Sequence, residues 1–280
     1  MTVFTRRNPA DTARAVRRLM ELAAESDVQV RVPPGELDKH DLEPFDNAEF
    51  GADPAGETDL AVVLGGDGTI LSTLRLYAGR DVPVFAVNYG AIGFLATVEN
   101  ADLEDGLRRA LAGDFDVLKL PVLTAETTRG DEIAVNDISF HRRQTGRVAE
   151  LAYSVRGEEL GEVRCDGLVV ATPAGSTGYN LANGGPVLAW GVEGYVVSFI
   201  APHTLTARAL VVAPTDLLEV TNRSTGDDPV DMTTDGRPAT PIASGETVRI
   251  RFEEGRSLLA QTEGATFYHR MRDKFGRLAY

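Results

Sequence analysis

Apolar residues recur at helical spacing near the start of the chain. Within residues 11–24, Val16, Leu19 and Met20 follow the i, i+3, i+4 pattern of one helix face among charged neighbours, which predicts an amphipathic helix. The next stretch, residues 33–58, is rich in Asp, Glu, Gly and Pro. We expect a loop there, with one or two short elements and little core.

A βαβ pattern follows this polar stretch. Residues 60–64 form a continuous apolar run that is too short for a buried helix and does not alternate, so it predicts an inner strand of a parallel sheet. A glycine turn leads to a helical pattern that begins near Thr69, and residues 82–88 predict a second strand. We expect a further helix over residues 103–112.

The pattern changes after residue 120. From residue 121 to residue 259, short runs rich in Val, Ile and Thr alternate with glycine turns, and the only helix signal follows Ser176. Residues 267–278 return to helical spacing. We therefore predict an N-terminal α/β domain with a parallel sheet (1–120), an all-β C-terminal domain (121–259), and a final segment (260–280) that packs back on the first domain.

The charge of the chain limits its partners. Acidic residues number 42 against 28 Lys and Arg, which gives a net charge of −14, and only three of the basic residues are lysines. Such a surface repels nucleic acid and anionic membranes, so we expect neither as a partner. Solubility and adaptation to high salt, which screens self-repulsion, both account for such acidity, and we favour the second. A polyanionic substrate would need a locally positive site.

The sequence has neither the apolar runs of a membrane span or secretory signal nor a pair of cysteines. No run approaches the roughly 18 apolar residues of a membrane span, and the N-terminal residues are charged where a secretory signal needs an apolar stretch, so we expect a cytoplasmic protein. Cys165 is the only cysteine, which excludes an intramolecular disulfide and a thiolate metal site. We expect it to fill space in the core.

The first chemical motif is GGDGT, between the predicted strand and helix. Gly65, Gly66 and Gly68 allow a tight turn that presents N–H groups to a phosphate, with Thr69 at the start of the helix. No Gly-Lys-Ser/Thr follows, and the G-x-G-x-x-G spacing is missing, so the motif is neither a Walker loop nor a Rossmann fingerprint. Asp67 is suited either to accept a proton from an attacking hydroxyl or to hold Mg²⁺; a solvated turn is the structural alternative.

Two longer motifs follow. NYGAIGFL (88–95) comes directly after the second predicted strand, where Asn88 can bind a ligand or brace a turn and Phe94 can form an apolar wall. DGLVVATPAGSTGYN (166–180), followed by GGP (184–186), reads as a strand, a turn and a helix start capped by Ser176 or Thr177. A helix start dense in hydroxyls and glycines suits an adenine or a phosphate.

Two short pieces complete the set. Asn136-Asp137 ends an apolar stretch, and Asp235 stands in the turn Thr234-Asp235-Gly236. Each is a common turn by itself. His141 and His203 match no metal-ligand spacing, and we expect structural roles for both.

In this order, GGDGT, NYGAIGFL, ND, DGLVVATPAGSTGYN…GGP and TDG, the sequence resembles the NAD kinase family along most of the chain. Diacylglycerol-type lipid kinases and phosphofructokinase relatives also carry GGDG turns, but they would not be expected to carry the TPxGSTxY block. The resemblance implies phosphoryl transfer from ATP or polyphosphate to the adenosine-ribose 2′-hydroxyl of NAD, giving NADP. It also implies Mg²⁺ or another divalent cation, an active site between an α/β and an all-β domain, and a homodimer or homotetramer.

The resemblance also assigns site residues. Asp67 matches the proposed catalytic aspartate, and no residue is assigned as a metal ligand. The positions implied for phosphate are Gly65, Gly66, Gly68 and Thr69, and those implied for NAD are Gly68, Asn88, Phe94, Asn136, Asp137, Asp166, Ser176, Thr177, Gly178, Tyr179 and Asp235.

Four positions depart from the family pattern. Asp137 stands where Glu is common, so its shorter reach favours a water-mediated contact or one made by Asn136 alone. Ala174 replaces Thr, Gly178 replaces Ala, and Ala182 replaces a small hydroxyl residue, which removes one side-chain contact.

A lipid or sugar kinase and a non-catalytic dinucleotide sensor are the rival hypotheses. The negative charge disfavours approach to anionic lipid. The sequence does not decide between ATP and polyphosphate as the phosphoryl donor, whether NADH is also accepted, or whether NADP exerts feedback.

Overall fold

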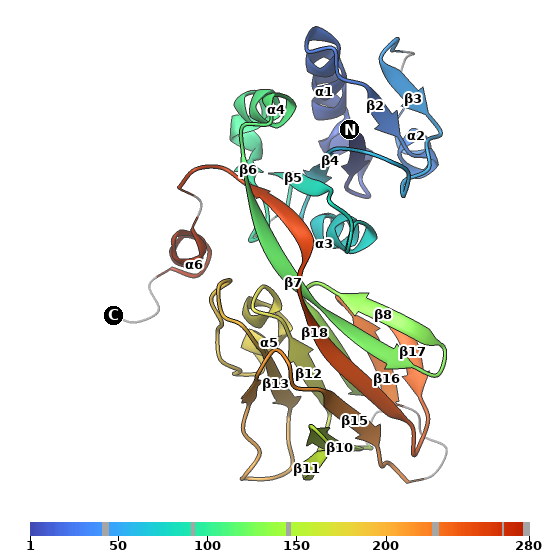
Figure 1. The fold of residues 1–280 in the computed structure, drawn as a ribbon, viewed down its shortest axis with the longest axis vertical. Helices are drawn as coiled ribbons and strands as arrows, with labels where there is room; N and C mark the ends of the chain where they lie inside the picture. Colours follow the sequence, from blue (N-terminus) through green and yellow to red (C-terminus); the bar gives the residue numbers. More distant parts are fainter. Residues whose placement is uncertain (41–44, 91–92, 144–146, 226–229, 265, 277–280) are drawn as a thin grey trace. The chain divides into compact units, whose positions relative to one another are not determined.

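The computed structural model describes residues 1–40, 45–90, 93–143, 147–225, 230–264 and 266–276, and it divides into two compact units (Figure 1). Unit 1 comprises Met1–Lys119 and Ser257–Tyr280, and unit 2 comprises Leu120–Arg256. The chain passes between the units within two long strands, β7 (Asp116–Thr127) and β18 (Thr247–Gln261).

Unit 1 is built on a parallel sheet. Its strands lie in the order β3 (Ala48–Phe50), β2 (Val30–Val32), β1 (Thr2–Thr5), β4 (Ala61–Gly65) and β5 (Pro83–Asn88). Every pairing in this series is parallel, and Leu258 and Leu259 of β18 extend the sheet beyond β5. The short strand β6 (Val98–Glu99) also pairs with β5. All five residues of β4 are buried, as expected for an inner parallel strand.

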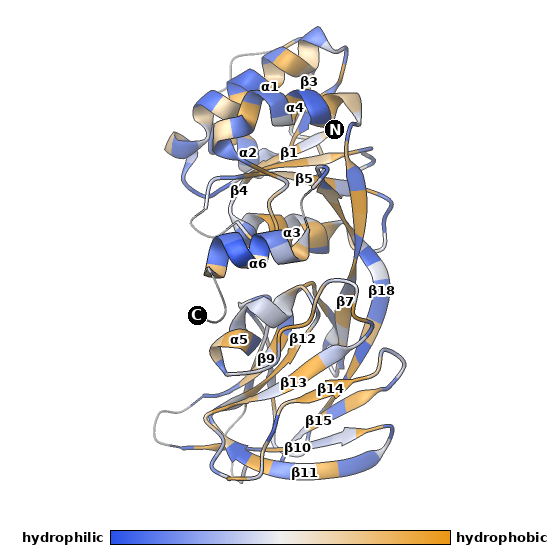
Figure 2. Cartoon of the chain, turned by 90° about the vertical axis from the view of Figure 1, so that its left-hand side faces the viewer, coloured by the Kyte–Doolittle hydropathy of each residue, from blue (hydrophilic) through white to orange (hydrophobic). Residues whose placement is uncertain are grey.

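Helices cover both faces of this sheet. Figures 1 and 2 show α1 (Ala13–Glu25) and α4 (Leu103–Ala112) on one face and α3 (Asp67–Leu76) on the other. Helix α1 buries Val16, Leu19 and Met20 against the strands, which is the face that the sequence predicts. Helix α4 ends at Gly113, whose φ of 70° is the left-handed conformation that glycine favours. The described part of unit 1 also contains the shorter helical elements η1 (Pro9–Asp11), α2 (Pro34–Leu37), η2 (Asn100–Asp102) and α6 (Phe267–Phe275).

Unit 2 is an antiparallel β-sandwich. One sheet has the order β14 (Leu210–Val212), β13 (Tyr195–Ile200), β12 (Gly167–Ala171), β9 (Asp137–Arg142), β16 (Val230–Thr234) and β17 (Arg237–Ile242). The other contains β11 (Glu158–Cys165), β10 (Ala149–Val155), β15 (Leu218–Asn222) and β18. Strand β8 (Gly130–Ala134) forms a hairpin with β7.

The core of unit 2 lies between its two sheets. Phe140 and Val170 of the first sheet belong to the same buried cluster as Leu151 and Val220 of the second. Cys165 is fully buried in this cluster, in agreement with the expected space-filling role. Two short helical elements, η3 (Gly175–Thr177) and α5 (Tyr179–Ala182), follow β12.

The predicted fold class, an α/β unit with a parallel sheet and a β-rich unit, is confirmed. The sequence did not predict β1 and β2, which are only four and three residues long. The predicted final helix is present as α6, but its expected end at residues 277–278 lies outside the described residues. No helix in the described part of the chain is long and apolar enough to cross a membrane.

Candidate active site

Asp67 lies where the inner strand β4 passes into helix α3. The strand ends at Gly65 and the helix begins at Asp67, so the aspartate is at the carboxyl edge of the parallel sheet, where open α/β sheets bind ligands. Its side chain accepts hydrogen bonds from the backbone N–H groups of Phe94 and Leu95, both at 3.1 Å. Each carboxylate oxygen can accept a further bond, so the half-buried group is oriented and still able to act on a ligand.

The glycines around Asp67 differ in what a side chain at each position would contact. A Cβ on Gly66 would approach the Cα of Gly90 at 3.1 Å, so this pair lets two loops at the sheet edge approach closely. A Cβ on Gly65 would lie 2.8 Å from the side chain of Thr69. Gly68 is exposed, and a Cβ there would meet no protein atom within 4 Å, so the space beside it is open to a ligand.

Asn88 and Phe94 are held by the protein itself. The Asn88 amide donates to Glu99 Oε2 at 2.7 Å, and its oxygen accepts from the N–H of Gly90 at 2.8 Å. Phe94 is buried, and its ring packs on Phe267 and Phe275 of helix α6. Both residues therefore shape the loop beside Asp67. Residues 91–92 of this motif lie outside the described residues.

Arg270 belongs to the same environment, although no motif points to it. It is buried on α6 and donates through Nη1 to the carbonyl oxygens of Phe94, at 2.9 Å, and of Ala96. Burial lowers the pKa of Arg270 to about 10, opposed by the charges of Asp67 and Glu99, so it stays cationic at neutral pH. A single arginine in a polar helix gives no sequence signal for this position.

Three residues of unit 2 form a second polar cluster. The Asp235 carboxylate accepts hydrogen bonds from the N–H groups of Asn136, at 2.7 Å, Asp137, at 3.2 Å, and Val135, at 3.1 Å. Asn136 and Asp137 are thus fixed where β9 begins. The side-chain oxygen of Asn136 is buried and has no hydrogen-bond partner among the described residues. A buried acceptor without a partner is costly, which favours a site that a ligand completes.

Asp137 in this cluster is almost completely buried. Burial, reinforced by the charge of Asp235, raises the pKa of Asp137 to about 7. Its side chain therefore exchanges a proton near neutral pH, and it donates a hydrogen bond when protonated and only accepts when ionised.

The turn after β12 closes against Asn136. Thr172 donates its N–H to the carbonyl of Asn136 at 2.9 Å and its hydroxyl to the carbonyl of Val135 at 2.7 Å. A Cβ on Gly175 would lie 2.0 Å from the Asn136 carbonyl oxygen, so only glycine fits there.

The predicted capping role of Ser176 or Thr177 is wrong. The residue before α5 is Gly178, and no side chain caps this helix. The Ser176 hydroxyl is buried and bonds the backbone of Pro173 and Leu188 at 2.7 and 3.1 Å, so it fixes the loop instead. Thr177 bonds the carbonyl of Ala174 at 3.2 Å. Capping fails because both residues lie within the 3₁₀ turn, one and two residues before the N-cap position of α5.

Tyr179 extends the cluster toward solvent. Its ring stacks on that of His141, with centroids 5.6 Å apart, and burial raises the pKa of its hydroxyl, with further contributions from Asp137 and Asp166. Asp166 pairs with Arg142, with Nε and Oδ1 3.0 Å apart. We expected a structural role for His141 from its spacing, and the stacking on Tyr179 places it at the edge of the cluster. His203 is exposed on a loop, and its backbone N–H donates to the carbonyl of Arg164 at 2.7 Å.

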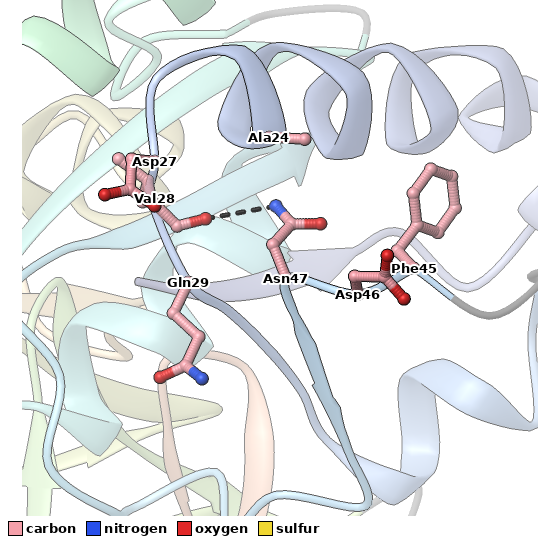
Figure 3. A pocket seen from close by; sticks show the side chains of 7 residues that line it. All are labelled: Ala24, Asp27, Val28, Gln29, Phe45, Asp46 and Asn47. Atoms are coloured by element: carbon pink, nitrogen blue, oxygen red, sulfur yellow. Dashed lines mark hydrogen bonds between the residues drawn. The ribbon is translucent and has the colours of Figure 1, made fainter.

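The predicted residues thus form one group in each unit. Unit 1 holds the glycine-turn residues Gly65 to Thr69 together with Asn88 and Phe94, and unit 2 holds Asn136, Asp137, Asp166, Tyr179 and Asp235. Figure 3 shows a hollow of unit 1 elsewhere, lined by Ala24, Asp27 to Gln29 and Phe45 to Asn47. It contains none of the motif residues, and the Asn47 amide bonds the Val28 carbonyl across it at 3.1 Å.

Comparison with known proteins gives consistent matches. Residues 8–115 match the ATP-NAD kinase N-terminal domain, and residues 135–260 match the ATP-NAD kinase C-terminal domain. An NAD kinase of Gemmatimonas aurantiaca is 36% identical over 240 residues, covering 83% of each chain.

Two solved structures share the fold. The yeast NADH kinase solved with NADH has a TM-score of 0.89 at 22% identity, covering 100% of this chain and 88% of its own. An Archaeoglobus fulgidus NAD kinase solved with ATP has a TM-score of 0.74 at 26% identity, covering 98% and 96%. With both of its domains matched, this chain belongs to the ATP-NAD kinase family.

Proposed function

We propose that this NAD kinase uses Asp67 to activate the adenosine-ribose 2′-hydroxyl of NAD for attack on the terminal phosphate of ATP. The observation that carries the proposal is the position of Asp67, at the carboxyl end of an inner strand and the first residue of a helix, with both oxygens held by backbone N–H groups. A hydroxyl is a weak nucleophile at neutral pH. A fixed carboxylate aligns it and accepts its proton late in the reaction.

The phosphates of the donor bind at the N-terminus of α3. The first N–H groups of a helix have no partner within it, and the helix dipole adds positive potential. The open space beside Gly68 supports this assignment, because a phosphate there would meet no protein side chain. In a loop without lysine, backbone N–H groups provide the protein's local share of positive charge.

The divalent cation enters with the donor. Among the described residues no group of three or more His, Cys, Asp or Glu side chains could hold a metal ion. Mg²⁺ commonly binds through substrate phosphates, keeps several waters and takes few protein ligands. We therefore treat the cation as part of the donor complex, in which it neutralises phosphate charge.

NAD is held by the cluster of unit 2. The buried Asn136 oxygen is free to accept a hydrogen bond from a ribose hydroxyl or an adenine amine, and Asp137 adds a second polar group. Tyr179, stacked on His141, offers a partly exposed aromatic face to a base. Asp235 supports this cluster by accepting hydrogen bonds from the backbone N–H groups of Asn136 and Asp137.

Formation of NADP tests the proposal. The purified chain is incubated with NAD, ATP and Mg²⁺, and NADP is measured with an NADP-specific dehydrogenase. Parallel reactions replace ATP by polyphosphate, and NAD by NADH, a diacylglycerol or a sugar. NADP formation that falls by roughly 10² to 10⁴ in Asp67→Asn is the expected result. Phosphorylation of the lipid or the sugar alone would support a rival kinase class, and binding of NAD without turnover would support a dinucleotide sensor.

A further inference from the structure

Residues Phe94 to Ala96 lie between a buried cation and the proposed catalytic carboxylate. Their N–H groups at Phe94 and Leu95 donate to Asp67, and the carbonyls of Phe94 and Ala96 accept from Arg270. The loop is therefore hydrogen-bonded on one side to the turn between β4 and α3, and on the other side to helix α6. All of these groups belong to unit 1.

One peptide group connects the two charges directly. The unit between Phe94 and Leu95 offers its carbonyl to Arg270 at 2.9 Å and its N–H to Asp67 at 3.1 Å. A peptide dipole has its negative end at the oxygen and its positive end at the N–H. The cation and the carboxylate thus sit at the ends that favour them, and each strengthens the other's hydrogen bond.

Arg270 is buried, and its guanidinium is hydrogen-bonded to a side chain as well as to the loop. It is 8% exposed, and Nη2 donates to the Gln261 side-chain oxygen at 2.5 Å. Gln261 is itself buried and bonds the carbonyl of Ala260 at 2.7 Å. The guanidinium is consequently oriented by β18 as well as by the loop, and a long flexible side chain is held in one geometry.

Resting on the proposed role of Asp67, we infer that Arg270 is a positioning residue for phosphoryl transfer, acting through the Phe94–Leu95 peptide to fix the carboxylate that orients the 2′-hydroxyl. Arg270 touches neither substrate nor reacting atom in this scheme. Its loss lets the 94–96 loop shift, and Asp67 loses its alignment. Misplacement by about 1 Å can lower turnover by roughly 10²-fold. We expect the substitution to lower kcat and to leave KM for NAD nearly unchanged, since the groups proposed to hold NAD belong to unit 2.

A double-mutant cycle tests this inference. Arg270→Met keeps the length of the side chain without its charge or donors. It is made alone and in the Asp67→Asn background, and kcat, the KM values for NAD and ATP and the folded fraction are measured for each variant. We expect kcat to fall about 10- to 10²-fold in the wild-type background and less than about twofold in the Asp67→Asn background, because residues acting as one unit are non-additive. Arg270→Lys, which keeps the charge and one donor, should recover part of the loss.

Controls separate positioning from helix docking. Arg272→Met changes an exposed arginine of the same helix that bonds His269 at 3.1 Å, and it should leave kcat unchanged. If Arg270→Met does not fold, the cycle is run with Arg270→Lys. Equal losses of kcat in both backgrounds, or an unchanged kcat in folded protein, would overturn the inference and leave Arg270 as a docking contact. Wild-type turnover in Asp67→Asn alone would instead remove the role proposed for Asp67.

Discussion

The carboxylate of Asp235 accepts a hydrogen bond from the backbone N–H of Asn136 at 2.7 Å. The φ of Asp235 is 48°, in the left-handed region that Asp and Asn tolerate better than most residues. Asp235 therefore combines a backbone conformation and an acceptor that together hold the start of β9. The family resemblance implies that Asp235 binds NAD, whereas these contacts give Asp235 a supporting role for Asn136 and Asp137.

The first prediction concerns Asp235→Asn, which keeps the backbone conformation but exchanges one acceptor oxygen for an amide donor. At least one of the three N–H groups then loses its acceptor, and we expect the free energy of unfolding to fall by about 1–3 kcal/mol and KM for NAD to rise. Urea unfolding and initial-rate kinetics measure both. Asp231→Asn, on the preceding strand β16 and in an exposed pair with Arg143, should change stability by less than about 1 kcal/mol. Equal effects of the two substitutions would contradict the supporting role.

Asp137 should make stability depend on pH. Its folded pKa is about 7, well above the ordinary value of 3.8 for an aspartate, so between these values the folded state holds a proton that the unfolded state has lost. The stabilising contribution is complete below about pH 4 and is lost as pH rises through 7, by up to about 1.4 kcal/mol per pH unit. Relative to Asp137→Asn, the wild type should therefore lose stability from pH 5 to pH 8. Parallel curves of unfolding free energy for the two proteins would show that Asp137 does not titrate in this range.

Substitutions of Asp137 should also separate binding from turnover. Asp137→Ala removes a polar contact to NAD, and we expect a loss of about 1–3 kcal/mol that appears chiefly in KM for NAD. Asp137→Glu restores the carboxylate found at this position in the family pattern and should be tolerated. Steady-state kinetics over a range of NAD concentrations make the comparison. An alanine variant with unchanged kinetics would reduce Asp137 to a turn residue.

Phosphoryl transfer should require a divalent cation. The GGDGT turn has no lysine, so charge that develops on the phosphoryl oxygens is met by the cation of the donor complex and by backbone N–H groups. NADP formation should cease when EDTA removes all divalent cations and return when Mg²⁺ is added in excess. Activity that persists after complete removal would refute this requirement.

How far the sequence predicts the structure depends on whether a feature is local. The strand 60–64, the glycine turn and the helix after it were predicted because apolar burial, turn chemistry and helix start all lie within one stretch. Strands β1 and β2 were missed because each is short and gains its stability from β4 and its neighbours. Their three or four residues carry too little periodicity to stand out.

The site shows the same division. The glycine turn between a strand and a helix indicated Asp67 from local pattern. Asn136 and Asp137 form a common turn by themselves, and only the family resemblance indicated them. Arg270 lies 176 residues from the carbonyl of Phe94 that it bonds, so only the fold brings them together. Ser176 was assigned to helix capping from local pattern alone, and its hydroxyl instead bonds Leu188, twelve residues later.

The last prediction concerns Asp67→Asn, which separates the chemistry of this carboxylate from its packing. The amide retains the shape of the side chain and one acceptor oxygen, so one of the two backbone bonds to Phe94 and Leu95 is lost, at about 1 kcal/mol. The variant should remain folded and bind NAD with nearly unchanged affinity. Turnover should nevertheless fall by roughly 10² to 10⁴, because the amide cannot accept the proton of the 2′-hydroxyl.

Single-turnover kinetics and thermal unfolding decide between these effects. Asp81→Asn, at an exposed position just before β5, serves as the matched control and should leave both turnover and stability unchanged. A variant of Asp67 with near-normal turnover would sink the catalytic assignment, because alignment by shape alone would then suffice. A variant that failed to fold would show that the bonds to Phe94 and Leu95 are structural. Since a loose transition state is helped more by positioning than by basicity, Asp67→Ser, which keeps neither, should lose at least as much turnover as Asp67→Asn.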